Sequence, residues 1–185
     1  MLVDIQCHDE SSLCSDDAFV IDTNVLMYIH RPQVEERNII IAGAYSRFID
    51  ALRRRECKLV VSSLNLQEAL NAIDSSCWKR YKEGLSDGHP DKEIRRKDYR
   101  ASVAERRKVK AEQGDFLLQI RQFYSIQPEC ISPGEVMFYY DTLDKHNYDP
   151  IDYIISLHYS TYGIITDDKD FTRDNDIAVY TLARA

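Results

Sequence analysis

Acidic and hydroxyl side chains directly follow two of the most apolar segments of this chain. Phe19-Val20-Ile21 runs into Asp22-Thr23-Asn24, and Gly163-Ile164-Ile165-Thr166 runs into Asp167-Asp168-Lys169-Asp170. Short apolar runs bounded by polar clusters are typical of buried strands in parallel sheets. In open α/β sheets, ligands bind outside the carboxyl ends of the strands. The two segments therefore predict a cation site to which both strands contribute carboxylates.

Further acids stand at the starts of two predicted helices. Glu68 follows the strand-like segment Lys58-Leu59-Val60-Val61-Ser62, and Asp149 and Asp152 flank the start of a later helix. Carboxylate oxygens suit hard cations such as Mg²⁺ or Mn²⁺, and such an ion would allow clustered acids to act on a polyanion. Each of the three also has a structural alternative. Glu68 could form a capping box with Asn65, and Asp149 and Asp152 could stabilise a helix N-terminus. For Asp22 the sequence indicates no capping role.

Alternating strands and helices would position these residues. Apolar periodicity predicts helices over 35–55, 66–81 and 135–145, a further helix that begins after Asp149, and a long charged helical segment over 91–124 with a possible break at Gly114. Strands are predicted at 19–21, 58–62, 163–166 and 177–182. This order is typical of βαβ units in an α/β fold with a mainly parallel sheet. Right-handed crossovers would bring the ends of the first and penultimate strands to one edge.

Length and charge narrow the class of protein. A chain of 185 residues, with 44% hydrophobic and 30% charged residues, predicts a single globular domain. The start of the chain is acidic and polar, and no apolar run approaches the roughly 18 residues of a membrane span, which predicts a cytoplasmic protein without a membrane partner. The formal net charge is −7, yet residues 79–121 carry 13 Lys and Arg against 8 Asp and Glu.

This basic middle of the chain could be an electropositive arm or a helix with mixed, solvated charge. An arm of this kind could contact RNA phosphates, a homodimer partner or a protein inhibitor. The candidate RNA-binding residues are Lys79, Arg80, Lys82, Arg95, Arg96, Arg100, Arg106 and Arg107. Trp78, Tyr81 and Tyr99 lie among them and could stack on single-stranded bases or pack against the domain.

Four segments, in order, resemble the motifs of PIN domains, the nuclease fold of VapC-type toxins. Phe19-Val20-Ile21-Asp22-Thr23-Asn24-Val25-Leu26 resembles the opening motif, and Ser63-Leu64-Asn65-Leu66-Gln67-Glu68 resembles the second. Asp152-Tyr153-Ile154-Ile155 resembles the third, and Ile165-Thr166-Asp167-Asp168-Lys169-Asp170-Phe171 is similar to the closing one. The resemblance implies a three-layer α/β/α sandwich, here within a single domain over 1–185 that carries a charged helical insertion at about 78–125.

The resemblance also implies an activity and the residues that perform it. The chain would be a metal-dependent endoribonuclease that leaves 5′-phosphate and 3′-hydroxyl ends, and it could be the toxin of a toxin–antitoxin pair. Asp22, Glu68, Asp152 and Asp168 would hold one or two Mg²⁺ or Mn²⁺ ions, with Asp149 an alternative to Asp152 and Asp170 an extra ligand. Thr23, Asn24 and Thr166 would orient those carboxylates. The alternative is an inactive PIN-fold RNA-binding or scaffold protein.

Overall fold

A computed structural model describes residues 1–31, 36–129, 131–141, 149–171 and 177–182 of the chain. Within these ranges, six strands form one parallel sheet in the order β1-β6-β5-β2-β3-β4. The strands are β1 (Leu2–Asp4), β2 (Ala18–Ile21), β3 (Lys58–Ser62), β4 (Ser125–Gln127), β5 (Gly163–Ile165) and β6 (Val179–Thr181). The predicted α/β class with a parallel sheet is therefore confirmed.

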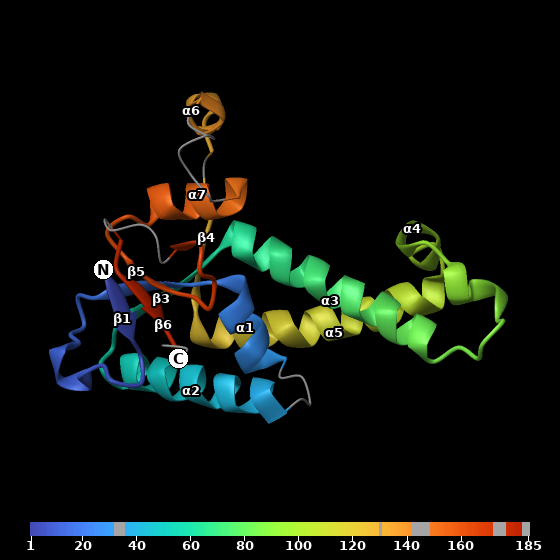
Figure 1. The fold of residues 1–185 in the computed structure, drawn as a ribbon, viewed down its shortest axis with the longest axis horizontal. Coiled ribbons are helices and arrows are strands. Elements are labelled where there is room, and N and C mark those ends of the chain that lie inside the picture. The colour runs from blue at the N-terminus through green and yellow to red at the C-terminus, as the bar shows by residue number, and fades with distance from the viewer. Residues whose placement is uncertain (32–35, 130, 142–148, 172–176, 183–185) are drawn as a thin grey trace.

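Helices cover both faces of this sheet, as Figure 1 shows. They are α1 (Thr23–His30), α2 (Glu36–Arg54), α3 (Ser63–Glu83), α4 (Arg96–Tyr99), α5 (Val103–Phe123), α6 (Pro133–Asp141) and α7 (Pro150–His158), with 3-10 turns η1 (Glu10–Ser12) and η2 (Pro90–Glu93). In the described part of the chain, no helix is both long and apolar enough to cross a membrane.

Alternate side chains of the central strands enter two separate cores. Phe19 and Ile21 of β2 pack with α1, α2, α3 and α5, whereas Val20 packs on the opposite face with Ile155 and Tyr159 at α7. Both faces of a parallel sheet are normally buried, which explains why these strands are continuous apolar runs. The result is the three-layer α/β/α sandwich expected from the sequence. The packing on both faces holds the ends of the central strands in place.

Part of the molecule extends away from these layers. In Figure 1 the far part of α3 and the first part of α5 run side by side beyond the sheet, with α4 near their end. We call residues 70–113, from the far part of α3 to the first part of α5, the helical arm. The end of α1 contacts it through the ion pair of Arg31 with Glu112. Nearer the sheet, His30 lies within hydrogen-bonding distance of Gln119 at 3.0 Å and of the Tyr124 hydroxyl at 3.0 Å.

The structure corrects several sequence-based boundaries. Helix α5 continues through Gly114, where a break was considered possible, and α1 starts directly after Asp22, where no helix was predicted. Strands β1 (Leu2–Asp4) and β4 (Ser125–Gln127) were also not predicted, because β1 has only two apolar residues and β4 only one. The predicted helix over 135–145 corresponds to α6, and its predicted end lies outside the described residues.

Candidate functional site

The carboxyl ends of β2, β3 and β5 meet at one edge of the sheet. Strand β2 lies between β3 and β5, and the chain returns across β2 to form β5, so the strand order reverses at this point. The Asp22 amide donates to the Ile165 carbonyl at 3.0 Å, and the Asn65 side-chain amide donates to the Ile21 carbonyl at 3.0 Å. These bonds hold the strand ends together where a doubly wound sheet usually binds its ligand.

Asp22 is a buried carboxylate at the centre of this edge. It is 7% exposed and caps α1, with Oδ1 accepting from the Thr23 amide at 2.7 Å and Oδ2 from the Thr166 hydroxyl at 2.8 Å. The expectation that Asp22 has no capping role was wrong. Burial raises its pKa to about 6, and the carboxylates of Glu68 and Asp168 add to the rise against the hydrogen bonds from Thr166 and Thr23.

Glu68 faces the same edge from α3. The N-cap of α3 is Ser62, whose hydroxyl accepts from the Asn65 amide at 3.0 Å, so the capping box considered for Asn65 and Glu68 is absent. Instead, the Thr23 hydroxyl donates to Glu68 Oε2 at 2.6 Å and lies 3.2 Å from the Asn65 carbonyl. Thr23 therefore fixes the Glu68 carboxylate beside Asp22.

Asp149 and Asp152 perform different tasks at the start of α7. Asp149 caps the helix, its Oδ1 accepting from the Ile151 amide at 2.8 Å and from the Asp152 amide at 2.9 Å. The pKa of Asp152 is raised to about 8, chiefly by burial. Neighbouring carboxylates contribute the rest, and they are Asp149, Asp22, Asp168 and Glu68. Asp152 therefore faces the other acids of the edge, while Asp149 is engaged with the backbone.

Asp167 and Asp168, which follow β5, also have different partners. The Asp168 amide donates to the Thr166 hydroxyl at 2.8 Å, and Asp168 Oδ1 accepts from the Asp170 amide at 2.9 Å. Asp167 instead accepts from the Tyr28 hydroxyl at 3.2 Å and lies 3.4 Å from the Tyr45 hydroxyl. Asp168 is therefore the member of this pair whose charge acts on Asp22 and Asp152.

This donor set can be tested against Mg²⁺ or Mn²⁺. Carboxylate oxygens are the ligands that these hard cations prefer, and the raised pKa values of the buried Asp22 and the half-buried Asp152 indicate negative charge that a cation would relieve. Among the residues that the structure describes, no group of three His, Cys, Asp or Glu side chains is close enough to enclose an ion. Mg²⁺ usually keeps several waters and takes one or two carboxylates, so the residues fit a partly hydrated ion.

Comparison with known proteins supports the fold. No protein-family model and no curated protein matches the chain. A solved structure with similar architecture is the VapBC2 complex from Rickettsia felis bound to a DNA fragment from their promoter. The match has a TM-score of 0.55 at 13% identity and covers 90% of this chain and 99% of that chain. At this identity the likeness shows a shared fold.

Two residues of the site were not singled out from the sequence. Asn65 is 1% exposed and bridges β2 and α1, and its buried Oδ1 atom has no hydrogen-bond partner among the residues that the structure describes. Glu129 accepts from the Ser63 hydroxyl at 2.6 Å and from the Tyr159 hydroxyl at 2.7 Å, which joins the chain after β4 to α3 and α7. Asn65 was considered only as a capping partner of Glu68 within the second motif, and Glu129 has no sequence signal beyond its polarity. By contrast Asn24, which was predicted to orient carboxylates, is exposed.

Most of the predicted RNA-binding cations have partners inside the arm. Their acceptors are Glu112 for Arg80, Asp98 for Arg95, Asp74 for Arg96 and Arg100, and backbone carbonyls for Arg106. Lys82 lies over the Trp78 ring. Lys79 and Arg107 are exposed and have no ion-pair partner among the described residues. RNA binding by the arm stays a prediction, and it depends mainly on these two residues.

Proposed function

We propose that this protein is a metal-dependent endoribonuclease that hydrolyses RNA phosphodiester bonds. The observation that supports the proposal is the position of Asp22 after β2, Asp168 after the neighbouring strand β5 and Asp152 in the first turn of α7, with the pKa values of Asp22 and Asp152 raised partly by the charges of these acids. Clustered acids alone would repel RNA, and a divalent cation removes that conflict. Perturbed carboxylates at the crevice of a doubly wound sheet are frequent at catalytic sites.

The residues would divide the work as follows. Asp22, Glu68, Asp152 and Asp168 would hold Mg²⁺ or Mn²⁺, one or two of them directly and the others through waters of the ion. When bound, the ion lowers the pKa of a water and neutralises charge that develops on the phosphate. Thr166 and Thr23 keep the carboxylates of Asp22 and Glu68 oriented through hydrogen bonds of 2.8 and 2.6 Å.

Asp149 and Asp170 would assist without being required ligands. Asp149 fixes the start of α7 and thereby the position of Asp152. The Asp170 amide holds the carboxylate of Asp168.

The biological setting belongs to the same proposal. A toxin of a toxin–antitoxin pair, acting in the cytoplasm, is the setting that the likeness to the VapBC2 complex favours. In that setting the partners are substrate RNA, an antitoxin protein and a second copy of the chain as a homodimer.

Activity on RNA tests the proposal directly. The purified protein should cleave single-stranded RNA with Mg²⁺ or Mn²⁺, leave 5′-phosphate and 3′-hydroxyl ends, and stop when EDTA is added. Asp22→Asn and Asp168→Asn should each reduce the rate by about a hundredfold or more, because they remove charge from the ion site. The control is Asp16→Asn, an exposed acid away from this edge, which should keep the wild-type rate.

Folding and binding measurements separate the outcomes. Circular dichroism should show that all three variants are folded. Cleavage that survives EDTA, or full activity in both site variants, would contradict the proposal. RNA binding without any metal-dependent cleavage would instead identify the chain as a PIN-fold RNA-binding or scaffold protein.

A further inference from the structure

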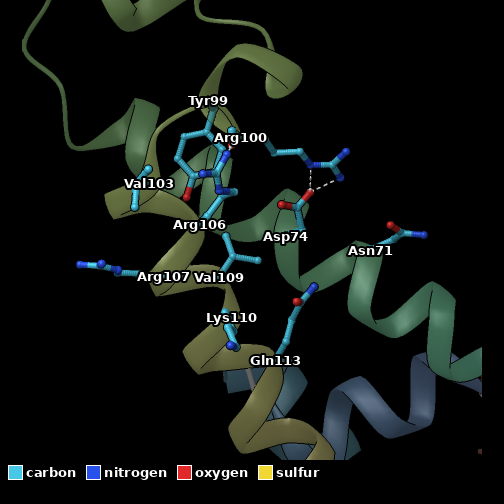
Figure 2. A pocket seen from close by; sticks show the side chains of 10 residues that line it. All are labelled: Asn71, Asp74, Tyr99, Arg100, Val103, Arg106, Arg107, Val109, Lys110 and Gln113. Atoms are coloured by element: carbon cyan, nitrogen blue, oxygen red, sulfur yellow. Dashed lines mark hydrogen bonds and ion pairs between the residues drawn. The ribbon is translucent and has the colours of Figure 1, made fainter.

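A groove of about 530 Å³ opens between α3 and α5 in the extended part of the molecule (Figure 2). We call it the α3–α5 groove. Its lining residues are Asn71, Asp74, Tyr99, Arg100, Val103, Arg106, Arg107, Val109, Lys110 and Gln113. The four candidate acids Asp22, Glu68, Asp152 and Asp168, which we call the acidic edge, are not among them. The volume is within the range of pockets that bind ligands.

The charge of this groove is opposite to that of the chain. Four lining side chains are cationic and one is acidic, whereas the chain has a formal net charge of −7. The acid, Asp74, is buried and already paired with Arg96 and Arg100. Arg107 and Lys110 are exposed and have no carboxylate partner in the described ranges. The groove therefore presents positive charge that the structure does not neutralise.

The floor of the groove is apolar. Val109 is 8% exposed and Tyr99 is 2% exposed, while Val103 at the rim is 54% exposed. Figure 2 shows Val103 and Val109 on α5 between the basic side chains, with Arg107 extending outward. Covering such a surface is favourable for an aliphatic side chain but gives no stabilisation to a phosphate group.

Among the residues that line the groove, no aromatic ring is exposed for stacking on bases. The Trp78 indole donates to the Ile94 carbonyl at 3.1 Å, the Tyr81 hydroxyl donates to Asp91 at 2.9 Å, and Tyr99 is buried. Single-stranded nucleic acids are usually held by exposed aromatic platforms next to a basic groove. Aliphatic contacts flanked by cations are instead the features that an acidic peptide recognises.

We propose that the α3–α5 groove is the docking site for an acidic, amphipathic segment of a partner protein. An aliphatic side chain of that segment would cover Val103 and Val109, and its flanking carboxylates would pair with Arg107 and Lys110. This interaction goes beyond the proposed nuclease activity and does not depend on it, since the groove and the acidic edge share no residue.

Fluorescence anisotropy with the full chain tests the proposal. The probe is a short labelled peptide in which Leu alternates with Glu and Asp, and the comparison peptide carries Gln and Asn in place of the acids. A short labelled oligouridylate in EDTA reports on RNA. The acidic peptide should bind, the neutral one should not, and binding should weaken as salt increases.

Matched variants locate the site. The double variant Arg107→Glu with Lys110→Glu should bind the acidic peptide about tenfold or more weakly than the wild type, because both flanking charges are reversed. Val103→Asn should lower the affinity for the acidic peptide by about threefold, because an apolar contact is lost. The control, Lys97→Glu with Arg121→Glu, makes the same charge change at exposed positions outside the groove and should leave affinity within about twofold.

Three outcomes would overturn the assignment. The first is an equal loss of peptide binding in the control and groove variants, which would indicate general charge attraction. The second is oligouridylate binding that the groove variant abolishes while peptide binding persists, which would make the groove an RNA site. The third is a dimer of the full chain that the groove variant dissociates, which would make the occupant a second copy.

Discussion

The acidic edge and the helical arm both contain many charged side chains, but the acids of the two regions have different neighbours. At the edge, the charges that act most on Asp22 and Asp152 are those of other carboxylates, and they raise the pKa of both groups together with burial. In the arm, Asp74 receives hydrogen bonds from two arginines, which hold its pKa below the ordinary value although burial opposes this. The buried acid of the arm is therefore paired with cations, whereas the acids of the edge lie among other acids.

This difference indicates which charges serve the fold. A buried acid paired with arginine contributes to packing between helices, and its removal leaves cations without a partner. Acids that raise one another's pKa reduce the stability of the folded chain and are retained where chemistry requires them. The four predictions below test this division, from the largest expected effect to the smallest.

Replacing Asp152 and Asp149 one at a time compares a proposed ion ligand of the acidic edge with the residue that caps α7. Asp152→Asn should reduce RNA hydrolysis by about a hundredfold, because it removes a carboxylate from the ion site. Asp149→Asn should leave the rate within about threefold, since Asn caps a helix as well as Asp does. Initial rates on a labelled RNA at saturating Mg²⁺ measure both. Equal losses in the two variants would remove the distinction between them.

Removing the carboxylate of Asp74 should destabilise the helical arm. Asp74→Ala should lower the free energy of unfolding by about 2 kcal/mol, because the hydrogen bonds from Arg96 and Arg100 are lost together. Urea denaturation followed by circular dichroism measures the change. A variant as stable as the wild type would show that these pairs do not hold the arm in place.

Without metal, the edge should make stability fall as pH rises. The pKa values of Asp22 and Asp152 are raised from 3.8 to about 6 and about 8, so the folded state holds these protons more tightly than the unfolded chain. This stabilising contribution is complete below the unfolded value and is lost as pH rises through the folded values.

In EDTA, the melting temperature should therefore decrease by several degrees between about pH 5 and pH 9, and added Mg²⁺ should restore it. Asp152→Asn should flatten the upper part of this profile, because the group with the higher pKa is gone. A flat profile in the wild type would mean that the carboxylates do not repel one another in solution.

The smallest effect is expected at an exposed ion pair of the arm. Arg95 and Asp98 are joined at 2.8 Å, but their side chains are 70% and 47% exposed. Asp98→Ala should change the free energy of unfolding by no more than about 0.5 kcal/mol, since water screens such pairs. It also serves as the matched control for Asp74→Ala. A loss comparable to that of Asp74→Ala would show that burial does not separate the two pairs.

Much of the fold and of the candidate site could be predicted from local patterns. The runs ending at Ile21, Ser62 and Ile165 are strands because both faces of the sheet bury apolar side chains. The parallel topology then required the acids that follow them to share an edge. The start of α7 was also predictable, because Asp149 followed by Pro150 is a strong helix-start signal.

Contacts between distant residues could not be predicted in this way. The sequence alone predicted the parallel α/β class and the central strands β2, β3 and β5, and it singled out the candidate acids Asp22, Glu68, Asp152 and Asp168. Only the tertiary structure decided that Asp22 caps α1, that Thr23 holds Glu68, and that Asp74 pairs with arginines of the arm. The reason is that periodicity reports which face of an element is buried, while the partner of a charged side chain depends on which elements fold against it.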